Sequence, residues 1–130
     1  MALVVLDASV IIAFLDSNDA HHAAAVAAVA AARDDDIVLP ASAYAEVLVG
    51  PYGRGSSAVR KVAEFITDLG MRIEPLTREM ASRAARLRAK GPRIGLPDAL
   101  VLATGDVLGA GRVLTADRAW PAISKRARAI

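Results

Sequence analysis

The sequence predicts an α/β protein, a three-layer α/β/α sandwich on a mainly parallel sheet of four or five strands. Short apolar, β-branched runs alternate along the chain with longer segments of helical spacing, and this alternation favours parallel strands connected by helices. A length of 130 residues suits one domain, which at this size buries about two-thirds of its unfolded surface and needs no disulfides to fold. We therefore expect residues 1–130 to form a single domain.

The first half of the chain contains two predicted strands, residues 2–6 and 37–40. The first is an uninterrupted apolar run, which is typical of a strand covered on both faces. Helices are predicted at residues 10–15 with Ser9 as the N-cap, at 19–32 after Asn18 or Asp19, and from Pro40 onward. The Gly- and Pro-rich segment 50–56 predicts a break after this third helix.

The second half continues the alternation. Residues 59–69 have amphipathic helical spacing and end at Gly70. A weak strand is predicted at 71–76, followed by a helix that Thr77 caps. We expect a loop at 91–95, a helix from Pro97, a strand at 112–114, and a short helix and edge strand within 120–130.

Composition excludes several classes of protein. Hydrophobic residues make up 55% of the chain and charged residues 23%, which excludes disorder. The absence of cysteine removes thiol catalysis and cysteine-ligated zinc. The sequence has neither an apolar run of about 18 residues nor a basic start before a hydrophobic stretch, so we expect a cytoplasmic protein without a membrane segment.

Basic residues are concentrated in one region, although the net charge is only +2. Within residues 72–93, Glu74 and Glu79 are the only acidic residues that oppose this positive charge. The basic residues of this region are Arg72, Arg78, Arg83, Arg86, Arg88, Lys90 and Arg93. Such a stretch is compatible with a polyanionic partner, and equally with a solvated helix face.

Four acidic residues are distinguished by their positions. Asp7 ends the first predicted strand, and Asp117 follows a late one. Glu46 lies in an otherwise apolar helix, and Asp98 opens another. In an open α/β sheet, ligands bind beyond the carboxyl ends of the strands. Asp7 and Asp117 would both point there, and the other two acids could reach the same place.

Each acid also has a purely structural interpretation. Asp98 could favour a helix N-terminus, Asp117 could cap a turn, and Glu46 could face solvent. Asp7 is harder to explain in this way, because a carboxylate at the end of a buried strand needs a partner and no Lys or Arg is near in sequence. Four converging carboxylates would repel one another, and a divalent cation would relieve that repulsion.

The available ligands favour a hard metal ion. The set offers oxygen atoms only, which suits Mg²⁺ or Mn²⁺ better than zinc. The two histidines, His21 and His22, are adjacent and point about 100° apart on a helix, so they cannot chelate one ion together. An acidic site for such an ion fits phosphoryl chemistry, in which the ion activates water and stabilises the leaving oxygen.

Four segments resemble the PIN-domain family, and more narrowly the VapC-type toxins of bacterial toxin–antitoxin pairs. They are VLDASVIIA at 5–13, SAYAEV at 42–47, GLPDALVLA at 95–103 and VLTADRAW at 113–120. The resemblance implies a single PIN domain with strand order 3-2-1-4-5 and the activity of a Mg²⁺- or Mn²⁺-dependent endoribonuclease. It assigns Asp7 and Asp98 as direct metal ligands, with Glu46 and Asp117 binding directly or through water.

The resemblance further implies that Ser9 and Thr115 orient the acids or the attacking water. It implies an RNA substrate such as tRNA or rRNA, a homodimer and a cognate VapB-type antitoxin. Two other interpretations stay open. One is an aspartate-based phosphatase, which would need a second acid beside Asp7. The other is an inactive module that binds RNA or protein through Arg83, Arg86 and Arg88.

Overall fold

The computed structural model describes residues 2–91 and 94–130. The strands are β1 (Leu3–Leu6), β2 (Asp36–Pro40), β3 (Arg72–Glu74), β4 (Arg112–Thr115) and β5 (Ala127–Ala129). The helices are α1 (Ala8–Leu15), α2 (His22–Ala31), α3 (Ala41–Arg54), α4 (Ser56–Asp68), α5 (Arg78–Lys90), α6 (Leu96–Leu108) and the 3₁₀ turn η1 (Trp120–Ala122). Of the predicted loop at 91–95, residues 92 and 93 lie outside the described residues.

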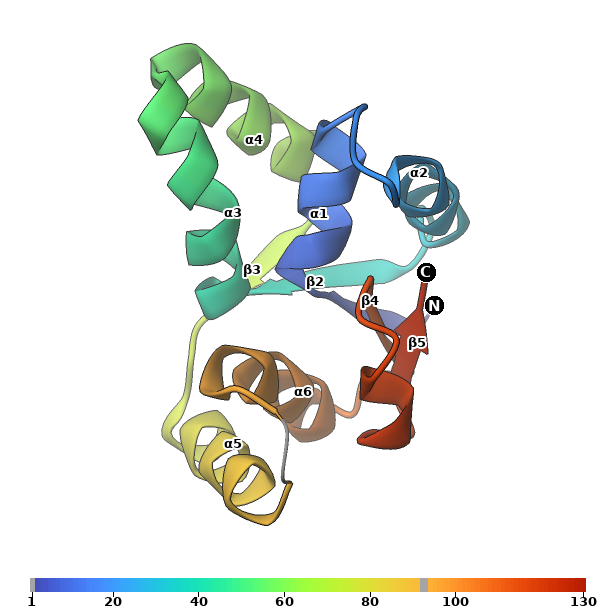
Figure 1. Ribbon diagram of the computed structural model, residues 1–130, viewed down its shortest axis with the longest axis vertical. Coiled ribbons are helices and arrows are strands. Elements are labelled where there is room, and N and C mark those ends of the chain that lie inside the picture. The colour runs from blue at the N-terminus through green and yellow to red at the C-terminus, as the bar shows by residue number, and fades with distance from the viewer. Residues whose placement is uncertain (1, 92–93) are drawn as a thin grey trace.

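The sheet has the order β3-β2-β1-β4-β5, and every neighbouring pair is parallel. Helices α1 to α4 cover one face and α5 and α6 cover the other, so the predicted three-layer sandwich and its strand order are confirmed (Figure 1). From β1 the chain builds the sheet outward through β2 to β3, then crosses to the opposite face before it enters β4. The order therefore reverses between β1 and β4, which is where α/β folds form their binding crevices.

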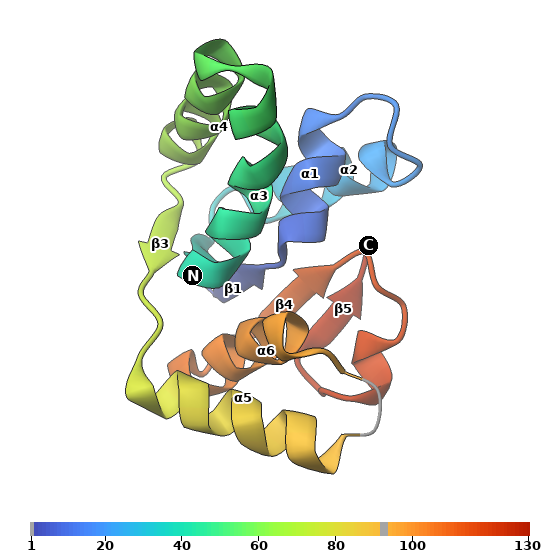
Figure 2. The same ribbon diagram turned by 60° about the vertical axis from the view of Figure 1, so that its left-hand side comes forward.

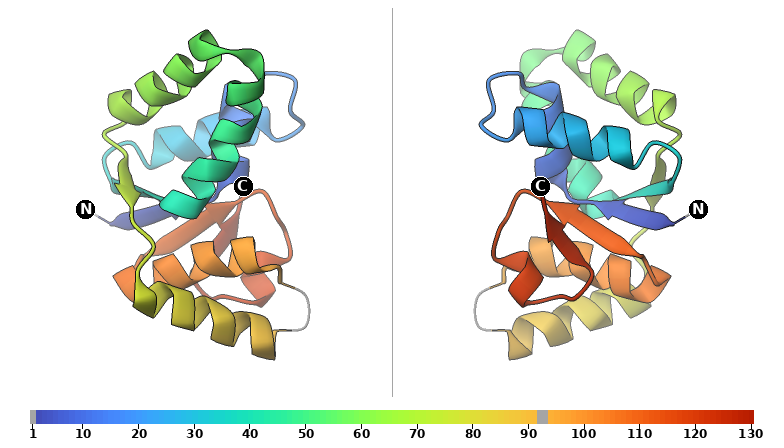
Figure 3. Two further views of the ribbon diagram at one scale, coloured as in Figure 1. Left: turned by 90° about the vertical axis from the view of Figure 1, so that its left-hand side faces the viewer. Right: turned by 90° about the vertical axis from the view of Figure 1, so that its right-hand side faces the viewer.

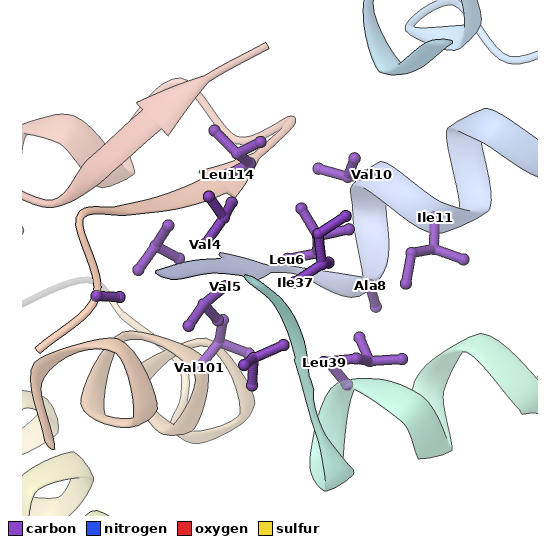
Figure 4. Close-up of a cluster of buried hydrophobic side chains, with 14 of the residues drawn as sticks. Val4, Val5, Leu6, Ala8, Val10, Ile11, Ile37, Leu39, Val101 and Leu114 are labelled. Atoms are coloured by element: carbon purple, nitrogen blue, oxygen red, sulfur yellow. The ribbon is translucent and has the colours of Figure 1, made fainter. Parts of the chain in front are cut away.

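The core lies on both sides of β1. Val4, Val5 and Leu6 are completely buried, as the continuous apolar run predicts for a central parallel strand. Val10 of α1 lies on one side of this strand and Val101 of α6 on the other (Figure 4). Because α1 and α6 pack on opposite faces of the same strand, their N-terminal ends are fixed relative to the end of β1.

The predicted break at residues 50–56 is wrong for most of that segment. Helix α3 continues to Arg54 with Pro51 inside it, and only Gly55, at φ 120°, interrupts the chain before α4. An internal proline costs a helix about 3 kcal/mol. Here Val47 and Pro51 are buried where α3 packs along α4 and α1, and this burial offsets the cost (Figure 2).

Two helix starts also differ from the prediction. Helix α1 begins at Ala8 with Asp7 in the N-cap position, so Ser9 lies inside the helix rather than before it. Helix α2 begins at His22, after a turn in which the Asp19 carboxylate accepts a hydrogen bond from the His21 amide at 2.8 Å. Thr77 caps α5 as predicted, since its hydroxyl accepts from the Met80 amide at 3.2 Å. None of the helices in the described residues combines the length and apolar character needed to cross a membrane.

Candidate active site

Asp7 is the buried centre of the candidate site. It directly follows β1, and its amide donates to the Leu114 carbonyl of β4 at 2.9 Å, so the backbone holds it at the reversal of strand order. Only 7% of its surface is exposed. Burial raises the pKa of its carboxyl group, and hydrogen bonds from Ser9 and Thr115 partly oppose that shift.

Two hydroxyl groups support this carboxylate. Ser9 Oγ donates to Asp7 Oδ2 at 2.7 Å, and Thr115 Oγ1 donates to the same oxygen at 3.0 Å. Each hydroxyl also accepts an amide of the β4 loop: Ser9 from Ala116 at 2.9 Å and Thr115 from Asp117 at 3.1 Å. The network joins the end of β1, the first turn of α1 and the end of β4. The second carboxylate oxygen, Oδ1, receives none of these side-chain hydrogen bonds.

The other acids lie around Asp7 within electrostatic reach. Glu46 is in the second turn of α3 and Asp98 in the first turn of α6. Burial raises the pKa of Glu46, and the charges of Asp7 and Asp98 add to this effect. Burial likewise raises the pKa of Asp98, with Asp7 and Asp117 adding to it. Each of the four predicted acids therefore interacts with at least one of the others.

Asp117 combines a structural role with its place in this cluster. Its side chain accepts a hydrogen bond from the Ala119 amide at 2.9 Å, so the turn interpretation is correct for one of its oxygens. The residue is exposed, and its charge still acts on Asp98. Glu46 is also exposed, as its structural interpretation expected, yet the charges of Asp7 and Asp98 still contribute to the rise in its pKa.

The cations that the structure describes form no salt bridge with these carboxylates. Among the described residues, Asp7, Glu46, Asp98 and Asp117 take part in no salt bridge. Their negative charges therefore accumulate in one crevice. An arrangement of this kind attracts a divalent cation or takes up protons.

The chemistry of the donor set suits a hard ion. Every candidate ligand is a carboxylate, supported by hydroxyl groups, which is the preference of Mg²⁺ and Mn²⁺. Within residues 2–91 and 94–130, no three acidic or histidine side chains converge tightly enough to form a complete metal cage.

Sequence reasoning gave no role to Trp120, although the residue lies in one of the quoted segments. Its buried side chain donates a hydrogen bond to Asp98 that partly opposes the rise in pKa. The indole N–H of a buried tryptophan needs a hydrogen-bond acceptor. This requirement is the sequence signal that could have pointed to a polar partner for Trp120. Asp106, in contrast, lies at the other end of α6 and pairs with Arg83 and Arg126, so it is not a further member of the site.

The fold and the crevice define a class: a doubly wound α/β protein with acidic residues at the reversal of strand order. The match of residues 4–126 to the PIN domain model shows that the chain belongs to the PIN-domain family. No curated protein sequence matches the chain.

Solved structures of toxins share this fold. VapBC2 of Rickettsia felis, bound to a promoter DNA fragment, aligns with TM-score 0.78 and 14% identity over 98% of both chains. FitAcB of Neisseria gonorrhoeae aligns with TM-score 0.76 and 22% identity over 98% of this chain and 96% of that one. The sarcin–ricin loop cleaving toxin VapC20 of Mycobacterium tuberculosis aligns with TM-score 0.74 and 20% identity over 92% and 93%. At these identities the likeness establishes the fold.

Proposed function

We propose that the protein is a Mg²⁺- or Mn²⁺-dependent endoribonuclease and the toxin of a toxin–antitoxin pair. The carrying observation is the acidic cluster itself, in which carboxylates from four separate segments influence one another and, within the described residues, take part in no salt bridge. Membership of the PIN-domain family supports the proposal, because PIN nucleases generally use divalent metal ions. Neighbours that are VapC and FitB-type toxins support the role in a toxin–antitoxin pair.

In this proposal the chain supplies a fixed set of oxygen ligands. Asp7 and Asp98 hold the ion directly, and Glu46 and Asp117 bind it directly or through water. The bound ion would activate water and stabilise the leaving oxygen of the scissile phosphate. Ser9 and Thr115 both donate to Asp7 Oδ2 and so fix the orientation of this carboxylate. Because Ser9 also binds the Ala116 amide, it fixes the distance between the α1 and β4 sides of the crevice.

The proposed partners follow from the comparison with the solved toxin structures. We propose an RNA substrate, such as tRNA or rRNA, and a VapB-type antitoxin that covers the acidic crevice. The solved VapBC complexes that share the fold support the antitoxin. A homodimer is part of the proposal and is tested by the mass of the purified protein in solution.

The test compares RNA cleavage by purified wild-type protein with cleavage by Asp7→Asn and Asp98→Asn. We expect cleavage that needs Mg²⁺ or Mn²⁺, that stops with EDTA, and that both variants lose while their circular dichroism stays unchanged. Asp68→Asn removes an equal charge from an exposed position at the end of α4 and is expected to cleave normally.

Metal binding provides a second measurement that does not depend on finding the right RNA. Calorimetric titration with Mn²⁺ should show binding to wild type and to Asp68→Asn, and weaker binding to Asp98→Asn. Wild-type protein that binds neither Mn²⁺ nor Mg²⁺ would contradict the proposal. An inactive RNA- or protein-binding module would instead bind RNA equally well before and after Asp7→Asn, and it would cleave in neither case.

A further inference from the structure

A basic groove lies beside the C-terminal end of α6, on the face of the sheet away from α1–α4. It has a volume of about 780 Å³ and is lined by residues of α5, α6 and the segment that leads into β5. Figure 3 shows α5 and α6 side by side on this face of the sheet. Its charged lining consists of Arg78, Glu79, Arg83, Arg86, Asp106 and Arg126. Asp98 and Asp106 are eight residues apart on α6, so the groove is about 12 Å along the helix axis from the candidate active site.

One carboxylate organises two of these arginines. Asp106 Oδ2 accepts from Arg83 Nε at 3.0 Å and lies 2.9 Å from Arg83 Nη2. Asp106 Oδ1 lies 3.3 Å from Arg126 Nε. The Asp106 side chain is 22% exposed, whereas those of Arg83 and Arg126 are 42% and 39% exposed. The negative charge is therefore less exposed than the two positive ones, and Arg126 is held further by a hydrogen bond from Nη1 to the Ala110 carbonyl.

The other two arginines of the groove are not neutralised by the protein. In the part of the chain that the structure describes, Arg78 and Arg86 form no salt bridge. Both line the groove together with Arg83, since positions 78, 82 and 86 of α5 are four residues apart and 79, 83 and 86 follow the same helical spacing. A guanidinium group has five N–H donors and binds phosphate oxygens in pairs.

A second groove extends the basic surface. It has a volume of about 510 Å³, shares Arg83, Asp106 and Arg126 with the first, and adds Lys125. The two grooves together present five basic side chains against two acidic ones, an excess of three. The whole chain carries only +2, so the remaining surface is slightly negative and the positive charge is concentrated here.

We propose that these joined grooves bind backbone phosphates of the RNA substrate, at a distance from the bond that is cut. This inference rests on the proposed ribonuclease function and adds a second contact region to it. Phosphate contacts hold a nucleic acid in register without reading its sequence. The two regions lie at opposite ends of α6, whose residues between them are almost all buried, so a strand held at the arginines would reach the acidic cluster over the surface beside this helix. An acidic peptide could also enter one groove, but the length of the joined surface favours a polyanionic chain.

The test measures binding with cleavage blocked. Every protein carries Asp7→Asn, EDTA is present, and the probe is a fluorescein-labelled unstructured RNA of about 20 nucleotides, longer than a typical single-strand site. Arg78→Gln/Arg86→Gln is compared with the control variant Arg33→Gln/Arg60→Gln. The control removes the same charge from two exposed positions, Arg33 after α2 and Arg60 on α4. Anisotropy gives the Kd at several salt concentrations.

We expect the groove variant to bind roughly 10- to 100-fold more weakly, since each charged hydrogen bond lost costs about tenfold. The slope of log K against log salt should become smaller by about 1.4, because two single-strand phosphate contacts are lost. The control variant should change affinity by no more than about twofold. An equal loss in both variants, or no loss in the groove variant, would overturn the inference.

Cleavage kinetics separate this inference from the proposed function. With Asp7 intact, Arg78→Gln/Arg86→Gln should raise KM and leave kcat unchanged, because the arginines do not touch the reacting phosphate. Unchanged KM in a protein that cleaves RNA would reject the groove and leave the nuclease proposal standing. Groove-dependent RNA binding by a wild-type protein that never cleaves would support the groove and reject the nuclease. Equal melting temperatures of the variants confirm that folding is unaffected.

Discussion

The close contact between α6 and β4 predicts that Gly105→Ala destabilises the protein, whereas Gly53→Ala, which lies outside this contact, stabilises it. A Cβ atom on Gly105 would lie 2.5 Å from Val113 Cγ2, whereas the optimum between carbon atoms is about 3.5–4.0 Å. Val113 cannot move away easily, because its strand is paired on both sides, with Val5 of β1 and Ala127 of β5. Gly53 is also inside a helix, but a Cβ there meets no atom within 4 Å.

The expected magnitudes follow from these distances. Alanine stabilises a helix interior by about 1 kcal/mol relative to glycine, and this gain applies to both positions. Overpacking by about 1 Å at Gly105 costs about 2 kcal/mol. Gly53→Ala should therefore stabilise the protein by about 1 kcal/mol, and Gly105→Ala should destabilise it by about 1 kcal/mol. For 130 residues the unfolding entropy is about 0.27 kcal/mol/K, so the melting temperatures should shift by about 4 °C in opposite directions.

Thermal and urea unfolding followed by circular dichroism measure both variants. The double variant Gly105→Ala/Val113→Ala tests the cause directly, because removing Cγ2 removes the clash. In the Val113→Ala background, the Gly105→Ala change should become neutral or stabilising. A Gly105→Ala protein as stable as Gly53→Ala would refute the close packing of α6 on β4, and with it the fixed position of Asp98.

Three further predictions concern charges and hydroxyl groups. The pKa values of Asp7, Glu46 and Asp98 are raised in the folded state. Their stabilising contribution is thus complete below the unfolded values of about 4 and is lost as the pH rises through the folded ones. The melting temperature of metal-free Asp98→Asn should accordingly exceed that of wild type by more at pH 7 than at pH 5, in a pH series of thermal scans. Thr115→Val should lower the free energy of unfolding by about 2 kcal/mol in urea titrations, because the buried Asp7 carboxylate loses a donor, whereas Thr115→Ser keeps it. Asp106→Asn should cost about 1 kcal/mol in low salt and less in high salt, measured in the same way.

Each of these predictions has a contradicting result. A constant difference between Asp98→Asn and wild type across pH would mean that the pKa of Asp98 is not raised in the folded protein. Equal destabilisation by Thr115→Val and Thr115→Ser would assign the effect to packing rather than to the hydroxyl group. An Asp106→Asn deficit that does not shrink with salt would rule out an electrostatic origin.

The positions of the four acids were accessible from sequence because they depend on local signals. The apolar run of β1 ends abruptly at Asp7, and Pro97 fixes the start of α6 close to Asp98. Parallel strands place such end positions at one edge of the sheet, so no knowledge of tertiary contacts was needed. The resemblance to the PIN-domain family then supplied the strand order that the pattern alone could not.

Other features depend on contacts between distant segments, and for these features the local sequence patterns gave wrong predictions or none. Pro51 ordinarily ends a helix, but packing against α4 and α1 keeps α3 continuous through it. Ser9 matches the pattern of an N-cap, yet its hydroxyl bridges Asp7 and the Ala116 amide, 107 residues away. The pairing of Asp106 with Arg126 likewise joins α6 to the segment before β5, and no spacing rule predicts it.

The acidic crevice lowers the stability of the metal-free protein, and the surrounding structure shows how the fold tolerates it. The hydroxyl groups of Ser9 and Thr115 and the indole of Trp120 stabilise the charged forms of Asp7 and Asp98 without neutralising them. An arginine in their place would neutralise the acids and would fill the position that a divalent ion needs. Neutral donors around uncompensated acids are therefore what a site must have if its missing positive charge is to arrive from solution.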